Sequence, residues 1–326
     1  MSNTMRRGFL TAAALALTLT AALPCAAQTY PAKPLLVLMP LQAGSAVDVM
    51  IRIVAQKMSE GLGQQIVIEN QPGAAGSIGA ERVKRAAPDG YTIGALNDSI
   101  LTMIPNIRKV GYDPLRDFEP VGVVAAISWV MVVSNDLPVK SVPDLIALAK
   151  KTPGRLDYSS GGNGSPQHVA MEAFKAATGI SLVHIPYRGA TQAAIDVMSN
   201  RVQAHMGAVS IVQPYIKDGR MRALGVPSAA RSPLLPEVPT FAEAGVPGFE
   251  WRTWASFAVP LGTPKPIVER LNAELVRAVS APEVREKLIA QGLEPIGSNP
   301  ATLTKWTGEG LARMKDIVQR ANIQAE

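Results

Sequence analysis

Apolar and polar positions along the chain follow two spacings that take turns. Short apolar runs at residues 35–40 and 65–70 have the length of strands, whereas residues 46–63 carry apolar positions at helical spacing and end on glycines. The same succession of strand and helix continues through residues 76–96 and 142–228. Strands that alternate with helices are typical of parallel sheets covered on both faces, so we expect an α/β fold.

The middle and the end of the sequence indicate two lobes. Two β-rich pieces in residues 118–136 meet near Ile127 and Ser128, and another strand is predicted at 253–260, after a proline-rich connector. Residues 265–326 have an almost entirely helical pattern. A chain that enters a second α/β unit and then returns to the first builds a two-lobed architecture. Ligands of such sheets bind beyond the carboxyl ends of the strands.

The N-terminal segment predicts export. Arg6 and Arg7 precede an apolar run over residues 9–23, and Cys25 begins a small-residue stretch of the kind that a signal peptidase cuts. We therefore expect residues 1–27 to be a signal peptide, read by the general secretory or the twin-arginine route, and the rest to be periplasmic. An N-terminal anchor is the alternative. The only cysteine falls in this signal, so the exported part has no disulfide and no thiolate ligand.

The charge pattern argues against a nucleic-acid partner. The formal net charge is +6, of which the two arginines of the predicted signal supply a third. The remaining positive residues are scattered, whereas a nucleic-acid interface gathers them with aromatic residues. A modest positive field favours anionic ligands.

Loops of small residues follow several predicted strands, and each opens a predicted helix. They span residues 40–48, 96–99, 159–168, 186–192 and 205–210. A helix N-terminus carries unpaired N–H groups and partial positive charge, so it binds carboxylate or phosphate without a cation. Glycine lets the backbone approach a ligand, while serine and asparagine add donors. The loops predict a shared anion-binding cleft; ordinary turns and helix caps are the alternative.

A set of longer motifs occurs in one order over the whole exported part. In chain order they include "AAPDGYTIG", "YDPLRDFEPV", "YSSGGNGSPQHVAMEAFK", "VHIPYRG", "RSPLLPEVPTFAEAGVPGFE" and "GTPKPIVERLNAELVRA". Together they resemble the Bug family, the periplasmic solute-binding proteins of tripartite tricarboxylate transporters. The resemblance implies a type II-like periplasmic binding protein with two Rossmann-like lobes. Two strands, near residues 124–131 and 254–257, would join the lobes: residues 28–125 and 255–326 as lobe 1, and residues 126–254 as lobe 2.

The resemblance also implies a function. A monomer would capture a small carboxylate, either a di- or tricarboxylate or an aromatic acid, and deliver it to the membrane permease subunits of the transporter. A ligand-sensing partner of a two-component sensor kinase is the alternative. A periplasmic hydrolase, with Ser165 and His168 as nucleophile and base, is a third, but the chain lacks a G-x-S-x-G elbow and a P-loop lysine. The histidines lack metal-ligand spacing, so we expect no metal, cofactor or catalysis.

Candidate ligand-binding residues come from all five loops. They are Gln42, Gly44, Ser45, Asn97, Ser99, Gly162, Asn163, Gly164, Ser165, His168, Tyr187, Gly189, Gly207 and Ala208. We predict that backbone N–H groups of Gly162 to Ser165, with the Asn163 side chain, hold one carboxylate at a helix N-terminus. Ser165 as a simple helix cap is the alternative. Arg188 is interpreted as a solvated charge, and the tryptophans near the crossings as hinge packing.

Two departures from the family pattern bear on the ligand. Ala43 replaces one of the paired glycines that the first loop usually carries. Gly207 and Ala208 stand where many members have an aspartate and then an asparagine, so a ligand ammonium would lose its counter-charge. Neighbouring apolar residues are Met206, Val209 and Ile211. We therefore expect a carboxylate with a hydrophobic or aromatic body rather than an amino acid.

Overall fold

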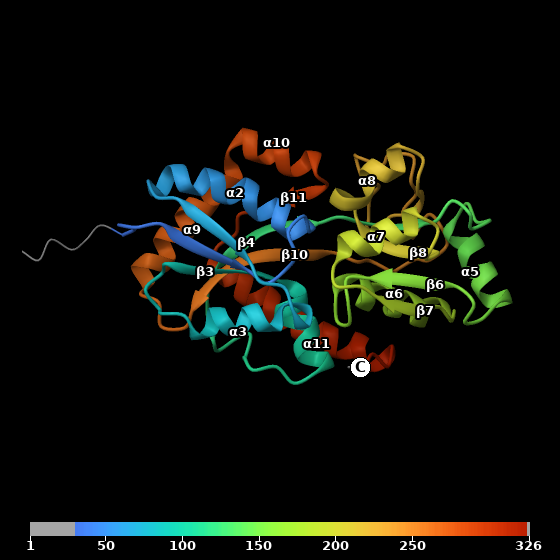
Figure 1. The fold of residues 1–326 in the computed structure, drawn as a ribbon, viewed down its shortest axis with the longest axis horizontal. Helices are drawn as coiled ribbons and strands as arrows, with labels where there is room; N and C mark the ends of the chain where they lie inside the picture. Colours follow the sequence, from blue (N-terminus) through green and yellow to red (C-terminus); the bar gives the residue numbers. More distant parts are fainter. Residues whose placement is uncertain (1–29, 325–326) are drawn as a thin grey trace, which may run out of the picture. The chain divides into compact units, whose positions relative to one another are not determined.

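The structure is a computed structural model that describes residues 30–324, so the predicted signal peptide lies outside the described residues. From Lys33 onward the chain forms one compact unit, which contains two sheets (Figure 1). The first half of the unit contains β1 (Leu35–Met39), α2 (Ala46–Leu62), β2 (Ile66–Asn70), η1 (Ala74–Gly76), α3 (Ser77–Arg85), β3 (Thr92–Asn97), η2 (Ser99–Met103), α4 (Ile104–Ile107), β4 (Phe118–Ile127), β5 (Trp129–Val133) and α5 (Val142–Lys151). The second half contains β6 (Asp157–Ser160), α6 (Pro166–Thr178), β7 (Val183–Pro186), α7 (Ala190–Met198), β8 (Ala204–Ala208), α8 (Val209–Lys217), β9 (Arg222–Gly225), β10 (Thr253–Pro260), α9 (Lys265–Ser280), α10 (Pro282–Ala290), β11 (Leu293–Pro295) and α11 (Pro300–Arg320).

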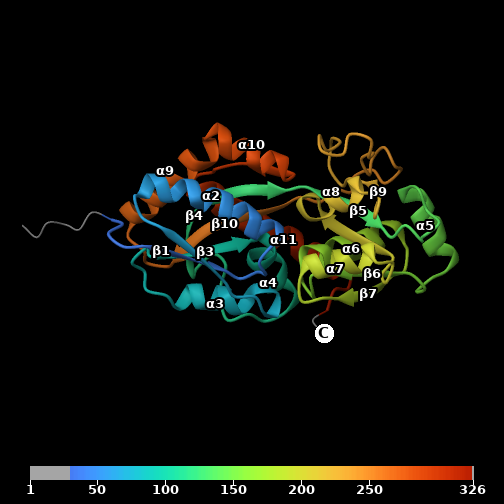
Figure 2. The same cartoon turned by 45° about the horizontal axis from the view of Figure 1, so that its top comes forward.

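The larger sheet has six strands in the order β11-β4-β10-β3-β1-β2. The strands β1, β2 and β3 pair in parallel, as the βαβ pattern predicts. Helices α2 and α9 cover one face, and α3 and α11 cover the other (Figure 2). The smaller sheet has the order β7-β6-β8-β5-β9 and is covered by α6, α7 and α8.

Both sheets are mixed, so the prediction of parallel sheets is wrong for several strands. In the larger sheet, β10 runs antiparallel to β3 and β4, and β11 runs antiparallel to β4. In the smaller sheet, β5 runs antiparallel to β8 and β9. The cause is the crossing: only Ser128 separates β4 from β5, so this strand pair enters the second sheet without the crossover helix that a parallel connection needs.

Local sequence signals set the helix ends next to the loops. Ser45 caps α2 by accepting the N–H of Asp48, and Gly63 ends that helix in the left-handed conformation with φ 66°. Ser165 caps α6 through the N–H of His168, so the capping interpretation of this serine is confirmed. The predicted helix after the loop at residues 96–99 is present as the π-helical η2 and the short α4, and only Asp98 separates η2 from β3.

Candidate functional site

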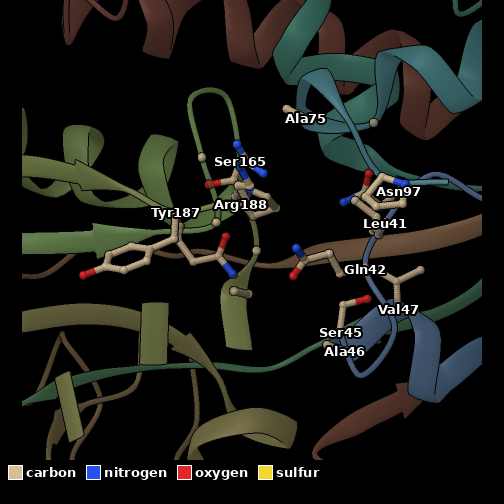
Figure 3. A pocket seen from close by; sticks show the side chains of 18 of the residues that line it. Leu41, Gln42, Ser45, Ala46, Val47, Ala75, Asn97, Ser165, Tyr187 and Arg188 are labelled. Atoms are coloured by element: carbon tan, nitrogen blue, oxygen red, sulfur yellow. The ribbon is translucent and has the colours of Figure 1, made fainter. Parts of the chain in front are cut away.

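A cavity of about 650 Å³ is lined by loops that belong to both sheets (Figure 3). Many of the predicted site residues line it. They are Gln42, Ser45, Asn97, Gly162, Asn163, Ser165, Tyr187, Gly189 and Ala208. All five predicted strand-to-helix loops therefore contribute at least one residue to this cavity. The loop at residues 96–99 contributes only Asn97, which is the last residue of β3.

The other predicted residues are not part of the cavity lining. They are Gly44, Ser99, Gly164, His168 and Gly207. The Ser99 hydroxyl donates a buried hydrogen bond of 2.7 Å to the Gly164 carbonyl. Gly207 has no room for a side chain, because an added Cβ would lie 2.6 Å from Cγ1 of Val212.

The first loop is fixed by a buried carboxylate. Asp48 accepts hydrogen bonds from the Gly44 N–H at 3.0 Å, from Arg52 Nε at 2.9 Å and from Asn70 Nδ2 at 2.9 Å. Burial alone would raise the pKa of Asp48, but these bonds outweigh it and lower the pKa below its usual value. The charge of Asp48 is paired with that of Arg52, one turn further along α2. Gln42 and Ser45 line the cavity, and the nearby carboxylate of Asp48 is not among the lining residues.

The glycine loop before α6 uses most of its own N–H groups, in contrast to the prediction. The Gly162 N–H donates to Ser160 Oγ at 3.1 Å, and the Gly164 N–H donates to His168 Nδ1 at 3.1 Å. The Ser165 N–H donates to the Gly162 carbonyl. Two of the three acceptors, Ser160 and His168, are side chains within four residues of the donor, and the sequence alone does not show that they turn towards these N–H groups. These N–H groups shape the loop rather than offering themselves to a ligand.

The N-terminus of α7 is more open to the cavity. Gly189 and Ala190 line the cavity, and no side chain caps this helix. Tyr187, just before it, donates its hydroxyl to Asp196 Oδ2 at 2.7 Å. Burial, with the bond to Asp196, raises the pKa of Tyr187 to about 12. The hydroxyl is thus engaged by Asp196, and Figure 3 shows it directed away from the other labelled side chains.

Among the described lining residues, Arg188 is the only one with a charged side chain. It is exposed, as a solvated charge would be, yet it borders the cavity beside Gly189. None of the described residues that line the cavity is an aspartate or a glutamate. The electrostatic field at the site therefore combines one cation with the positive ends of helices and favours an anion.

Apolar side chains form the remaining walls. Ile127, Trp129 and Ile211 line the cavity near Ala208. The Trp129 indole also donates to Thr253 Oγ1 at 2.9 Å, which joins the start of β5 to the start of β10. Trp129 therefore links the two crossing segments, and it is also part of the cavity wall.

One lining loop was missed. Residues 72–76 follow β2 and precede α3, and two of them, Ala74 and Ala75, have positive φ of 47° and 55°. The "QPGAAGS" stretch has the same strand–loop–helix signature as the loops that were found, so composition could have identified it. Positive φ outside glycine is unfavourable and is often found at functional sites.

Among residues 30–324, no three His, Cys, Asp or Glu side chains gather closely enough to hold a metal ion. Within the same range, no helix combines the length and the apolar character that a membrane crossing requires. The expectations of no metal, no cofactor and no catalysis stay predictions.

The chain has extensive similarity to known proteins. Residues 50–323 match the family model described as "Tripartite tricarboxylate transporter family receptor". A UPF0065 protein in the tcbD-tcbE intergenic region of Pseudomonas sp. (strain P51) is 38% identical over 100% of this chain and 97% of the relative. A solved structure from R. palustris with adipate is 34% identical, covers 90% of this chain and 99% of its own, and has a TM-score of 0.87. The periplasmic binding protein BugD is 30% identical, covers 91% and 100%, and has a TM-score of 0.86.

Proposed function

Because the chain belongs to the tripartite tricarboxylate transporter receptor family, we propose that it captures a small organic carboxylate in the periplasm and delivers it to membrane permease subunits. The observation that carries this proposal is the lining of the 650 Å³ cavity. It has one cation, Arg188, several helix N-termini and no acidic side chain among the described residues. Each of these features stabilises a bound anion electrostatically, whereas none of them favours a neutral sugar or a cation.

The apolar wall narrows the ligand class. Ile127, Trp129, Ala208 and Ile211 form a surface without charge, which suits a ligand with a hydrocarbon or aromatic body. An amino acid would place its ammonium group in a site without a counter-charge, and an unpaired buried charge is costly. The adipate-bound relative makes adipate a reasonable first probe.

We also propose that residues 28–125 with 255–326 and residues 126–254 are two lobes that close on the ligand. The support is that strands of the larger sheet all fall in the first set and strands of the smaller sheet in the second, apart from the ends of β4 and β10. Closure should lower the radius of gyration measured by small-angle scattering. An unchanged radius with saturating ligand would contradict the hinge but not the binding.

A thermal-shift screen tests the function itself. The purified protein is screened against mono-, di- and tricarboxylates and aromatic acids, with amino acids, sugars and divalent cations as comparison sets. A true ligand at 100 times its Kd should add roughly 2.7 kcal/mol of stability. A clear shift with a sugar or a cation, together with no response to any carboxylate, would overturn the proposal.

A further inference from the structure

The loop of residues 72–76 forms a left-handed turn in the cavity wall. All five of its residues line the cavity, and Figure 3 shows Ala75 on the side of Asn97, across the cavity from Tyr187. Four consecutive residues have positive φ: 146° at Gly73, 47° at Ala74, 55° at Ala75 and 99° at Gly76. Glycine adopts such angles at little cost, whereas they are unfavourable for alanine. The two alanines therefore need contacts that hold them in this conformation.

Packing and one backbone bond fix the glycine end of the turn. The Gly76 N–H donates to the Gly73 carbonyl at 2.8 Å. An added Cβ on Gly76 would lie 2.7 Å from Cδ1 of Ile100, which is part of the buried core of the larger sheet. Gly76 thus has no freedom to move towards the core, and the conformation of the alanines depends on other contacts.

Those contacts converge on the carbonyl of Ala74. Nη2 of Arg108 donates to this carbonyl and also to Ser77 Oγ, at 3.3 Å from the latter. The same carbonyl accepts the Ser77 hydroxyl at 3.0 Å and the Ser77 N–H. One of its three donors is therefore a cation, and a hydrogen bond from a charged donor is stronger than one between neutral groups.

Arg108 reaches the turn from outside the cavity lining. It is the C-cap of α4, where its own N–H donates to the Ile104 carbonyl at 3.0 Å, and it is half-buried. In the described part of the chain, its side chain donates to the Ala74 carbonyl and the Ser77 hydroxyl, and neither partner is a carboxylate. The guanidinium is therefore directed at a neutral carbonyl of the turn rather than at an acid.

Fixing the Ala74 carbonyl also orients a donor of the cavity wall. The C=O and the following N–H of a trans peptide point in opposite directions, so the bond from Arg108 turns the Ala75 N–H away from the guanidinium. Within residues 30–324, the N–H groups of Gly73, Ala74 and Ala75 have no acceptor. Successive N–H groups of a turn that have no acceptor can hydrogen-bond an anion.

We infer that Arg108 is a positioning residue for ligand binding. It holds the Ala74 carbonyl, and through it the left-handed turn of residues 73–76, in the shape that a ligand meets in the cavity. The effect on affinity rests on the proposed function. The effect on the turn does not, because these hydrogen bonds exist in the ligand-free protein.

Nuclear magnetic resonance on the ligand-free protein tests the effect on the turn. Arg108→Met keeps most of the length of the side chain and removes its donors. The hydrogen-exchange protection of the Gly76 and Ser77 amides should fall by about tenfold, because the turn loses one charge-assisted hydrogen bond. The carbonyl carbon resonance of Ala74 should move as well. Unchanged protection together with an unchanged Ala74 resonance would overturn the inference.

Arg222 on β9 provides the matched control. Its Nη1 donates to the carbonyls of Leu137 and Val139 at 3.1 Å and 2.8 Å, and none of these three residues lines the cavity. Arg222→Met therefore removes comparable bonds elsewhere, and the amides of the turn should stay as in wild type. An equal loss of adipate affinity in Arg222→Met and Arg108→Met would mean general destabilisation and would contradict the inference.

Binding of adipate is the second arm. The Kd for adipate should rise by about tenfold in Arg108→Met, and the difference should persist in about 0.5 M salt, because screening weakens a long-range field more than a hydrogen bond at contact. A difference that disappears in salt would make Arg108 a source of field and not a positioning residue. Arg108→Lys keeps a cationic donor, so its Kd should lie closer to that of wild type. A Kd equal to that of Arg108→Met would contradict the role of the donor.

A double-mutant cycle with Ser77→Ala tests whether both side chains act on one carbonyl. Because Ser77 and Arg108 share the Ala74 carbonyl, the rise in Kd in the double variant should be smaller than the product of the two single rises. A rise equal to that product would show that the two act independently and would contradict the shared role. If adipate does not bind even the wild type, the choice of ligand fails, and the amide measurements still decide the role of Arg108.

Discussion

The hydroxyl of Ser99 donates a hydrogen bond of 2.7 Å to the carbonyl of Gly164, and both groups are buried. Ser99 directly follows Asp98 at the end of β3 in the larger sheet, whereas Gly164 belongs to the loop between β6 and α6 in the smaller sheet. A second contact of this kind, from Thr191 Oγ1 to the Gly44 carbonyl, is longer at 3.4 Å and exposed. The Ser99 bond is therefore the stronger of these two links between loops of different sheets.

Replacing Ser99 by alanine should weaken ligand binding. The substitution removes a link between the loops that enclose the cavity and leaves the Gly164 carbonyl without this donor, at a cost of about 1 kcal/mol. The Kd for adipate, measured by calorimetry, should rise roughly fivefold. Ser256→Ala is a matched control, because it deletes a buried bond of 2.8 Å to the Leu96 carbonyl within one sheet. Both variants should lose stability in urea, and an equal loss of affinity in the control would contradict the role of Ser99.

Much of the fold could be predicted because its signals are local. The helix α2 has apolar residues at helical spacing between a serine cap and a glycine end, and both ends lie where the pattern puts them. Strand direction is different in kind. The antiparallel pairing of β10 with β3 and β4 joins segments more than a hundred residues apart. The spacing of apolar residues within one segment therefore cannot predict it.

The site shows the same division. Loops at strand-to-helix junctions could be found from composition, and most of them line one cavity. The partners of their backbone groups could not, because the acceptor of the Gly164 N–H is a ring nitrogen placed by α6 and its stack with His184. Arg188 looked like any exposed cation, and only the fold sets it beside the cavity.

Arg188 should contribute to affinity for anions. Arg188→Ala removes the only charged side chain among the described lining residues, so the Kd for adipate should rise by about five- to tenfold at low ionic strength. The difference should shrink in 0.5 M salt, since the side chain is exposed and screened. Arg116→Ala is the control, because Arg116 is exposed and lies outside the cavity lining. An identical Kd in wild type and Arg188→Ala at low salt would show that this cation takes no part.

A carboxylate introduced at Ala208 should lower the affinity of the site for anions. Ala208 lines the cavity and is the N-cap of α8, which no side chain caps. Ala208→Asp should therefore leave the protein as stable as wild type or slightly more stable, since aspartate is a favourable cap. Adipate binding should weaken more than tenfold through like-charge repulsion.

Ala208→Asn separates charge from size in the same position. It has nearly the same volume as the aspartate variant and should retain most of the affinity. The screen of amino acids should be repeated on Ala208→Asp, where an ammonium group would have a counter-charge. Equal affinities of the Asp and Asn variants for adipate would refute the electrostatic argument.

Asp98 should make the stability of the protein fall as the pH rises. Its side chain is 2% exposed, and burial raises its pKa to about 8, although the nearby Arg313 charge opposes the shift. The folded state thus holds a proton that the unfolded chain, with a pKa near 3.8, has already lost. The stabilising effect of that proton is complete below about pH 3.8 and disappears progressively as the pH approaches 8.

The variant Asp98→Asn mimics the protonated carboxyl group at every pH. Its free energy of unfolding, measured in urea, should exceed that of wild type by an amount that grows between pH 4 and pH 8, to the order of a few kcal/mol. Asp144→Asn changes an exposed aspartate with a lowered pKa, so it should be less stable than wild type by an amount that is complete slightly above pH 3.8 and stays constant up to pH 8. The two curves should therefore diverge with rising pH, and the divergence should come from Asp98 alone. A constant gap between Asp98→Asn and wild type would mean that Asp98 ionises normally and is solvated within the folded protein.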